Sequence, residues 1–244
     1  MLQRANIPSK AGRRFAVSNI AWADLHNDRM LDILAREGAR GVELAASLVW
    51  PEPVKTTNRE RMKYCKAIQS KGLSITGLHS LLYARQDVQL LGAGEGYRTA
   101  RDYLMRTVDL CADLGGRYMV IGGPKNRRRG ALSVEEAKKR GAVILHEVGG
   151  YAASCGCFFA LEALPAPECD FVTNLRECEE LVRLANTPGV QLHLDTGAAD
   201  VTDRELPDET LIEILQHARH CHINDFNLLP PGSKTPNNHN RWAR

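Results

Sequence analysis

Short apolar runs alternate with amphipathic segments along most of the chain. Seven of these runs have the length and composition of buried strands: residues 15–19, 41–45, 73–79, 117–121, 158–161, 190–194 and 220–223. Apolar positions recur at helical spacing between them, over residues 29–36, 58–71, 97–114, 133–154 and 207–217 and from residue 174 onward. Strands that alternate with helices at this spacing predict a parallel sheet covered by helices, with about seven β/α repeats.

Capping residues mark several of the predicted helix ends. Asn58 is the expected N-cap of the second helix. Ser133 and Glu136 form a capping box at the start of the fourth, and Asn174 with Glu177 caps the fifth. A glycine follows the predicted end of three helices, at Gly38, Gly72 and Gly115. These signals support the helical reading of the amphipathic segments.

Two α/β architectures fit this pattern, an open doubly wound sheet and a closed barrel. The sequence G-x-G-x-x-G does not follow the first predicted strand and G-x-x-x-x-G-K-[ST] does not occur, so the usual nucleotide-binding signals of an open sheet are missing. We therefore expect a (β/α)8-type TIM barrel, incomplete at about seven repeats. It is predicted to form a single domain over residues 1–244, with an irregular C-terminal tail at residues 226–244.

Three of the predicted strands end in a residue that can bind a metal ion. Glu162, Asp195 and His222 close the fifth, sixth and seventh runs. A buried strand that ends in a carboxylate or an imidazole carries a desolvation cost, which a shared polar site offsets. The C-terminal ends of barrel strands gather at one face, where barrel enzymes place their active sites. The three residues are therefore predicted to converge.

Composition and charge narrow the class of protein. The 244 residues are 43% hydrophobic and 25% charged, which is typical of a globular domain. The 32 basic residues nearly balance the 29 acidic ones, so the charge favours neither nucleic acid nor a membrane surface as a partner. No stretch approaches the roughly 20 apolar residues of a membrane span, and residues 1–14 lack the apolar region of an export signal. The seven cysteines form no C-x-x-C pair, so we expect no disulfide framework and a cytoplasmic location.

Six short motifs carry a resemblance to a known family. They are S-N-I-A-W at 18–22, G-V-E-L-A at 41–45, G-P-K-N-R at 123–127, L-E at 161–162, L-H-L-D-T-G at 192–197 and H-C-H-I-N-D at 220–225. In this order and at strand ends, the set resembles the xylose isomerase-like TIM barrels. That family includes sugar-phosphate isomerases and epimerases and the relatives of endonuclease IV.

The resemblance implies a metal site. A divalent cation would be held by Glu162, Asp195 and His222, together with a second Glu from the last barrel strand, and Glu162 would also act as the acid/base catalyst. Oxygen-rich coordination slightly favours Mn²⁺, whereas Mg²⁺, Co²⁺ and Zn²⁺ suit the same ligand types. Isomerisation or epimerisation beside a carbonyl needs a base that removes a carbon-bound proton and an acid that returns it, while a cation steadies the enediolate oxygen.

The chain departs from the family pattern in two places. Ala198 stands where many relatives have a histidine, so one polar contact near the metal is expected to be absent. Residues 226–244 are rich in Pro, Asn and Gly and contain neither an apolar strand nor a carboxylate, so we expect the eighth strand and its Glu to be missing. Three ligands can still bind metal, more weakly. An incomplete barrel leaves its first and seventh strands as open edges, and a homodimer is one way to cover them.

Four further polar residues are candidates near the predicted site. His193 lies two positions before Asp195 and so faces the same side of its strand, where we expect a hydrogen-bonded supporting histidine rather than a ligand. His79 ends the third strand and either contacts substrate or is structural. Glu43 either orients substrate or forms a salt bridge inside the barrel, and Asp225 is expected to hold loop geometry.

Cationic and aromatic side chains at the same mouth are candidates for substrate contact. Lys125 and Arg127 follow the fourth strand, where such groups bind a substrate phosphate or carboxylate; the alternative is an ordinary solvated loop. Trp22 and Trp50 follow the first two strands and either stack on a sugar ring or serve in the core or a lid.

The predicted function is that of a metal-dependent sugar or sugar-phosphate isomerase or epimerase, which acts on a small carbohydrate by proton transfer through an enediolate. Two alternatives stay open: a sugar- or metal-binding barrel with impaired or no catalysis, and an endonuclease IV-like phosphodiesterase. The phosphodiesterase is less favoured, because it needs several metals with more His and Glu ligands and a charged track for DNA.

Overall fold

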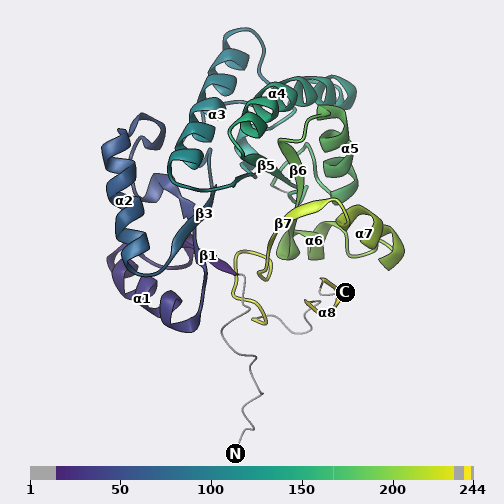
Figure 1. Cartoon of the computed structure of the whole chain (residues 1–244). Helices are drawn as coiled ribbons and strands as arrows, with labels where there is room; N and C mark the ends of the chain where they lie inside the picture. Colours follow the sequence, from purple (N-terminus) through teal and green to yellow (C-terminus); the bar gives the residue numbers. More distant parts are fainter. Residues whose placement is uncertain (1–14, 167, 234–238, 243–244) are drawn as a thin grey trace, which may run out of the picture.

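Seven parallel strands form one curled sheet in the computed structural model, which describes residues 15–166, 168–233 and 239–242 (Figure 1). Each strand pairs with the next one along the chain. The strands are β1 (Ala16–Ser18), β2 (Gly41–Ala45), β3 (Ser74–His79), β4 (Tyr118–Ile121), β5 (Phe158–Glu162), β6 (Val190–Asp195) and β7 (Ala218–His222). The predicted TIM-barrel architecture with about seven β/α repeats is confirmed.

Helices follow the strands and lie outside the curled sheet (Figure 1). They are α1 (Asn27–Glu37), α2 (Asn58–Ser70), α3 (Glu95–Asp113), α4 (Val134–Ser154), α5 (Leu175–Ala185), α6 (Thr196–Thr202), α7 (Asp208–Leu215) and α8 (His239–Trp242). Five 3-10 turns occur in the connections: η1 (Asn19–Ala21), η2 (Asp24–His26), η3 (Ala46–Leu48), η4 (Pro53–Lys55) and η5 (Pro124–Asn126). None of the helices in the described ranges is long and apolar enough to cross a membrane.

One predicted helix cap is wrong. The N-cap of α2 is Thr57, not Asn58. The Thr57 hydroxyl accepts a hydrogen bond from the Glu60 backbone N–H, and the Glu60 carboxylate accepts one from the Thr57 N–H at 2.8 Å. This reciprocal pair satisfies two N–H groups at the helix start, which a cap at Asn58 would leave unpaired. Ser133 and Asn174 are confirmed as the N-caps of α4 and α5. The capping box predicted for Ser133 and Glu136 is wrong, because the Glu136 carboxylate accepts a hydrogen bond from Arg140 instead.

Side chains alternate in direction along the strands, and this alternation separates an apolar core from a polar interior. In β2, Val42 and Leu44 belong to the hydrophobic core, whereas Glu43 between them meets polar side chains of other strands. In β6, His193 and Asp195 share one face in the same way. The polar interior therefore lies on the inner face of the curled sheet.

The two edges of the sheet are β1 and β7. Within the described residues no strand pairs with the outer side of either one, and no eighth strand occurs. After β7 the chain forms an isolated antiparallel bridge between Asp225 and Leu229, and α8 follows later in the tail. Two predictions fall on residues that the structure does not describe. They are the lack of an export signal in residues 1–14 and, in part, the irregular tail, at residues 234–238 and 243–244. The homodimer and the single-domain boundary stay predictions.

Candidate metal centre

The three predicted ligands come together at the C-terminal ends of adjacent strands. Glu162 of β5, Asp195 of β6 and His222 of β7 form a cluster with His193, in which the possible ligand atoms all lie within 4.8 Å of one another. Strand register explains the convergence, because Glu162 pairs with His193 and Asp195 pairs with His222 in the parallel ladder. Side chains at matched heights on neighbouring strands then project to the same place.

Glu162 is positioned by its surroundings and titrates near neutral pH. Gly122, directly after β4, leaves the room that its carboxylate needs: a Cβ at Gly122 would lie 2.2 Å from Glu162 Oε2. Nη1 of the buried Arg127 donates a hydrogen bond to the Glu162 backbone carbonyl at 2.6 Å. Burial, reinforced by the charge of Asp195, raises the pKa of Glu162 to about 7, against the opposing effects of His222 and Arg127. A carboxyl group with that pKa can take up and return a proton at physiological pH.

Asp195 is both a strand-end carboxylate and a helix cap. It is buried, and its Oδ1 accepts a hydrogen bond from the Ala198 N–H at 2.8 Å as the N-cap of α6. Its Oδ2 accepts one from Asn224 Nδ2 at 2.7 Å. Because each carboxylate oxygen has two lone pairs, both oxygens can still bind a cation. The two bonds hold the carboxylate in a fixed orientation beside Glu162.

Glu43 is a buried carboxylate that joins several histidines on the inner face of the sheet. His222 Nε2 lies 2.8 Å and 3.0 Å from its two oxygens, so this side chain links β2 to β7 across the interior. His79 Nδ1 is 3.7 Å away and His220 Nε2 is 3.5 Å away. Burial acts to raise the pKa of Glu43, but the hydrogen bond with His222 and the nearby histidines outweigh it, and the pKa is lowered. Glu43 therefore stays ionised inside the barrel.

His79 connects Glu43 to β1. Its Nε2 lies 2.5 Å from the hydroxyl oxygen of Ser18 on β1. Burial lowers its pKa to about 4, although Glu43 opposes the shift. His79 is thus a neutral imidazole held between Ser18 and Glu43.

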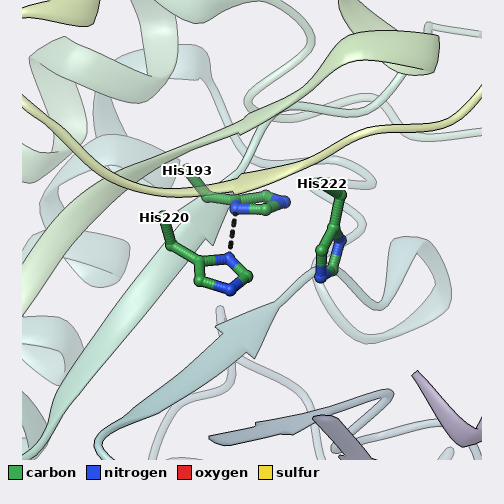
Figure 2. A group of neighbouring side chains, drawn as sticks. All are labelled: His193, His220 and His222. Atoms are coloured by element: carbon green, nitrogen blue, oxygen red, sulfur yellow. Dashed lines mark hydrogen bonds between the residues drawn. The ribbon is translucent and has the colours of Figure 1, made fainter. Parts of the chain in front are cut away.

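Three histidines pack together between β6 and β7 (Figure 2). The rings of His193 and His220 are stacked, with centroids 4.9 Å apart, and their Nδ1 atoms share a hydrogen bond of 3.0 Å. His222 stands edge-on to both. On its other side His220 packs against Tyr118, with ring centroids 3.9 Å apart. Burial lowers the pKa of His220 to about 4 and that of His193 well below its ordinary value, so both rings are neutral.

The other predicted site residues lie outside the four-residue cluster. Lys125 is exposed in η5, whereas Arg127 is 1% exposed and faces the backbone of β5. Trp22 is half-buried and donates a hydrogen bond from Nε1 to Asn27. Asp225 is buried and lies 2.6 Å from His239 Nε2, a contact that ties the tail to the end of β7.

Sequence reasoning missed three residues that shape the centre. Gly122 leaves room for the Glu162 carboxylate, and Tyr118 packs against the ring of His220. Nothing in the sequence around either residue indicates these roles. Asn224 lies in the H-C-H-I-N-D motif, yet its bond to Asp195 depends on a contact 29 positions apart in the chain. All three contacts depend on the sheet register, which no local signal in the chain specifies.

The metal-free protein is expected to lose stability as the pH falls from about 7 to about 5. His79 and His220 have folded-state pKa values of about 4, below the ordinary 6.5, so the unfolded chain binds more protons in this range and stability rises with pH. Glu162, whose pKa is raised to about 7, acts in the opposite direction. His193, whose pKa is also lowered, adds to the loss, and His222, whose pKa is raised, opposes it. The histidines with lowered pKa values outweigh the two groups with raised values, and the net loss is about 1–3 kcal/mol. Urea unfolding in EDTA at both pH values checks this, and equal or greater stability at the lower pH would contradict it.

A family match covers most of the chain. The xylose isomerase-like TIM barrel family matches residues 31–242, which is well over half of the sequence. The chain belongs to this family. The match includes β2 to β7, and so all of the strands that carry Glu43, Glu162, Asp195 and His222.

Several solved structures share the fold. The chain superposes on 3-keto-D-glucoside 4-epimerase from E. coli with a TM-score of 0.74 at 18% identity, covering 94% of this chain and 86% of the epimerase. A D-psicose 3-epimerase from Clostridium cellulolyticum H10 gives a TM-score of 0.70 at 15% identity, covering 87% and 73%. A probable 3-DHS dehydratase from Bacillus anthracis gives 0.65 at 14% identity, covering 86% and 73%. A search of curated proteins found no significant match.

Proposed function

We propose that the chain is a metal-dependent sugar or sugar-phosphate isomerase or epimerase that acts by proton transfer through an enediolate. One observation carries the proposal: Glu162, with a pKa raised to about 7, lies beside Asp195 and His222 at the C-terminal ends of three adjacent strands. Sugar epimerases among the structural neighbours support the same reaction class.

The donor groups of the centre fit a divalent cation. Two carboxylates and two imidazoles offer ligand atoms within 4.8 Å of one another. Within the part of the chain that the structure describes, the Nε2 atom of the fully buried His193 has no hydrogen-bond partner. Glu162, Asp195 and His222 would hold the cation. When bound, it would polarise the substrate carbonyl and stabilise negative charge on its oxygen. Mn²⁺ is the ion that we favour from the oxygen ligands.

Glu162 is the proposed acid/base group. In an isomerisation its carboxylate would remove the proton from the carbon next to the carbonyl and return it to the neighbouring carbon on the same face. An epimerisation would also need an acid on the opposite face, a role that the family pattern gives to the Glu of the eighth strand. Arg127 fixes the backbone of Glu162, and Gly122 leaves the space in which the carboxylate lies. The position of the base is therefore set by the connection between β4 and α4 as well as by β5 itself.

Substrate contacts are proposed for residues around the cluster. Lys125 is exposed just after β4 and would bind a substrate phosphate or carboxylate. The burial of Arg127 favours a role in orienting Glu162 over direct contact with the substrate. His79 and Glu43 lie on the inner face beside His222 and would shape the floor of the site.

Deuterium exchange tests the proposed function. The Mn²⁺-loaded protein is incubated in deuterium oxide with D-fructose, D-psicose, D-tagatose and their phosphates, and incorporation at the carbon beside the carbonyl is followed by NMR. We expect incorporation for at least one sugar, and its loss on treatment with EDTA. Metal binding without exchange on any of them would favour the noncatalytic binding barrel, and no metal binding would refute the proposal.

A further inference from the structure

The Nε2 atom of His193 is a buried polar atom that has no hydrogen-bond partner among the described residues. The side chain is completely shielded from solvent, and its Nδ1 shares a hydrogen bond with His220. Leaving such an atom unsatisfied costs about 1–3 kcal/mol. The same ring belongs to the cluster of Glu162, Asp195 and His222. A cation bound by these three potential ligands would also satisfy this nitrogen.

We propose that His193 Nε2 is the fourth ligand of the cation held by Glu162, Asp195 and His222. The inference rests on the proposed function and adds to it a ligand from within β6. It replaces the supporting role that the sequence predicts for this histidine. The coordination would then be completed by strands that the structure describes, without a carboxylate from an eighth strand.

Strand geometry places His193 where a ligand is needed. His193 and Asp195 are two positions apart on β6 and project to the same side. His193 is the register partner of Glu162 on β5, so these two side chains start at the same height. Spacings of up to 4.8 Å between donor atoms close onto one ion with shifts of a few tenths of an ångström, because ligand bonds are about 2.0–2.2 Å long.

Contacts around Glu43 favour the proton positions that a metal requires on both imidazoles. If His193 keeps Nε2 unprotonated, its Nδ1–H donates to Nδ1 of His220, and His220 then carries its proton on Nε2, which faces Glu43 at 3.5 Å. His222 donates from Nε2 to the same carboxylate, so its Nδ1, which lies 3.9 Å from Asp195 Oδ2, is the nitrogen that would bind the metal once it has no proton. One buried carboxylate thus orients two metal-binding histidines, as outer-shell carboxylates do in metal sites.

A second imidazole changes the expected metal preference. Two carboxylates with two imidazoles form a more nitrogen-rich set than the three-ligand site predicted from the sequence. Imidazole suits Zn²⁺ and Co²⁺ better than Mg²⁺. We therefore expect His193 to contribute more to the affinity for Co²⁺ than to that for Mg²⁺.

A matched pair of substitutions tests the ligand role. In His193→Asn the side-chain amide NH₂ lies near the position of Nδ1, so the bond to His220 is kept and the Nε2 ligand is lost. In His193→Gln the amide oxygen reaches the position of Nε2, so a weak ligand is kept and the bond to His220 is lost. Calorimetric titration with Co²⁺ should show one ion bound by the wild type and an affinity about 10- to 100-fold weaker in His193→Asn, with a smaller loss in His193→Gln.

The outcomes separate this inference from the proposed function. Wild-type affinity in His193→Asn, or a larger loss in His193→Gln than in His193→Asn, would overturn the ligand role while leaving the proposed function intact. Failure of the wild type to bind Co²⁺ or Mn²⁺ would overturn both. If either variant does not fold, the wild type still decides: in the NMR spectrum of the cadmium-loaded protein, two imidazoles should couple to the metal, and coupling to one alone would refute the inference.

Discussion

Replacing Glu162 by glutamine is expected to lower the rate of substrate deuterium exchange by about 100- to 10,000-fold. Glutamine has nearly the same shape but cannot accept a proton from carbon, and the raised pKa of Glu162 is the property that suits it to this step. The fold should survive, because the substitution removes a buried carboxyl group without changing its volume. The rate is measured in deuterium oxide with Mn²⁺ held in excess, so that weaker metal binding does not limit the reaction.

A matched surface substitution controls for the loss of one negative charge. Glu205 is exposed, and Glu205→Gln should leave the exchange rate unchanged. An exchange rate in Glu162→Gln within a few-fold of the wild type, at saturating Mn²⁺, would contradict the assignment of Glu162 as the acid/base group.

Adding a single methyl group at Gly122 is expected to weaken metal binding by about 10- to 100-fold while leaving the fold intact. The new Cβ would lie 2.2 Å from Glu162 Oε2, and the next nearest atom is the Cδ of the same side chain at 3.4 Å. The flexible end of Glu162 can move aside at little cost to folding. It would then leave the position from which it approaches Asp195 and His222. Titration with Mn²⁺ and thermal unfolding of the metal-free protein measure the two effects separately.

Gly150→Ala provides the control for this substitution. Gly150 lies in α4, and a Cβ there meets no atom within 4 Å. Because alanine is the better helix former, this variant should be as stable as the wild type or up to about 1 kcal/mol more stable, with unchanged metal affinity. Equal metal affinity in Gly122→Ala and the wild type would mean that Glu162 does not need its present position to bind the ion.

Periodicity and strand ends are sufficient to predict most of the fold and of the cluster. Side chains alternate in direction along a strand, so the two-residue spacing of His193 and Asp195 predicts that they share a face. The C-terminal ends of parallel barrel strands meet at one face, which predicts that Glu162 and His222 lie near Asp195. Local signals also locate most helix starts, although Thr57 replaces Asn58 because a reciprocal bond with Glu60 decides between two neighbouring capping residues.

The remaining features depend on contacts between distant parts of the chain. The bond between Glu43 and His222 joins residues 179 positions apart, and the sequence alone leaves Glu43 undecided between substrate and salt bridge. The sequence does not predict the short helix α6, because its seven residues are too few to show helical periodicity. Its N-cap, Asp195, is predicted as a metal ligand and therefore does not mark a helix start. The unpaired Nε2 of His193 has none either, because it depends on which side chains of other strands surround the ring.

The most direct test of a metal centre at these strand ends is an anomalous difference map from crystals of the protein grown with Mn²⁺. We expect one strong peak at bonding distance from Glu162, Asp195 and His222, with His193 Nε2 as the fourth ligand. A peak between Glu43 and His79 instead, or no peak at the ends of β5, β6 and β7, would contradict it.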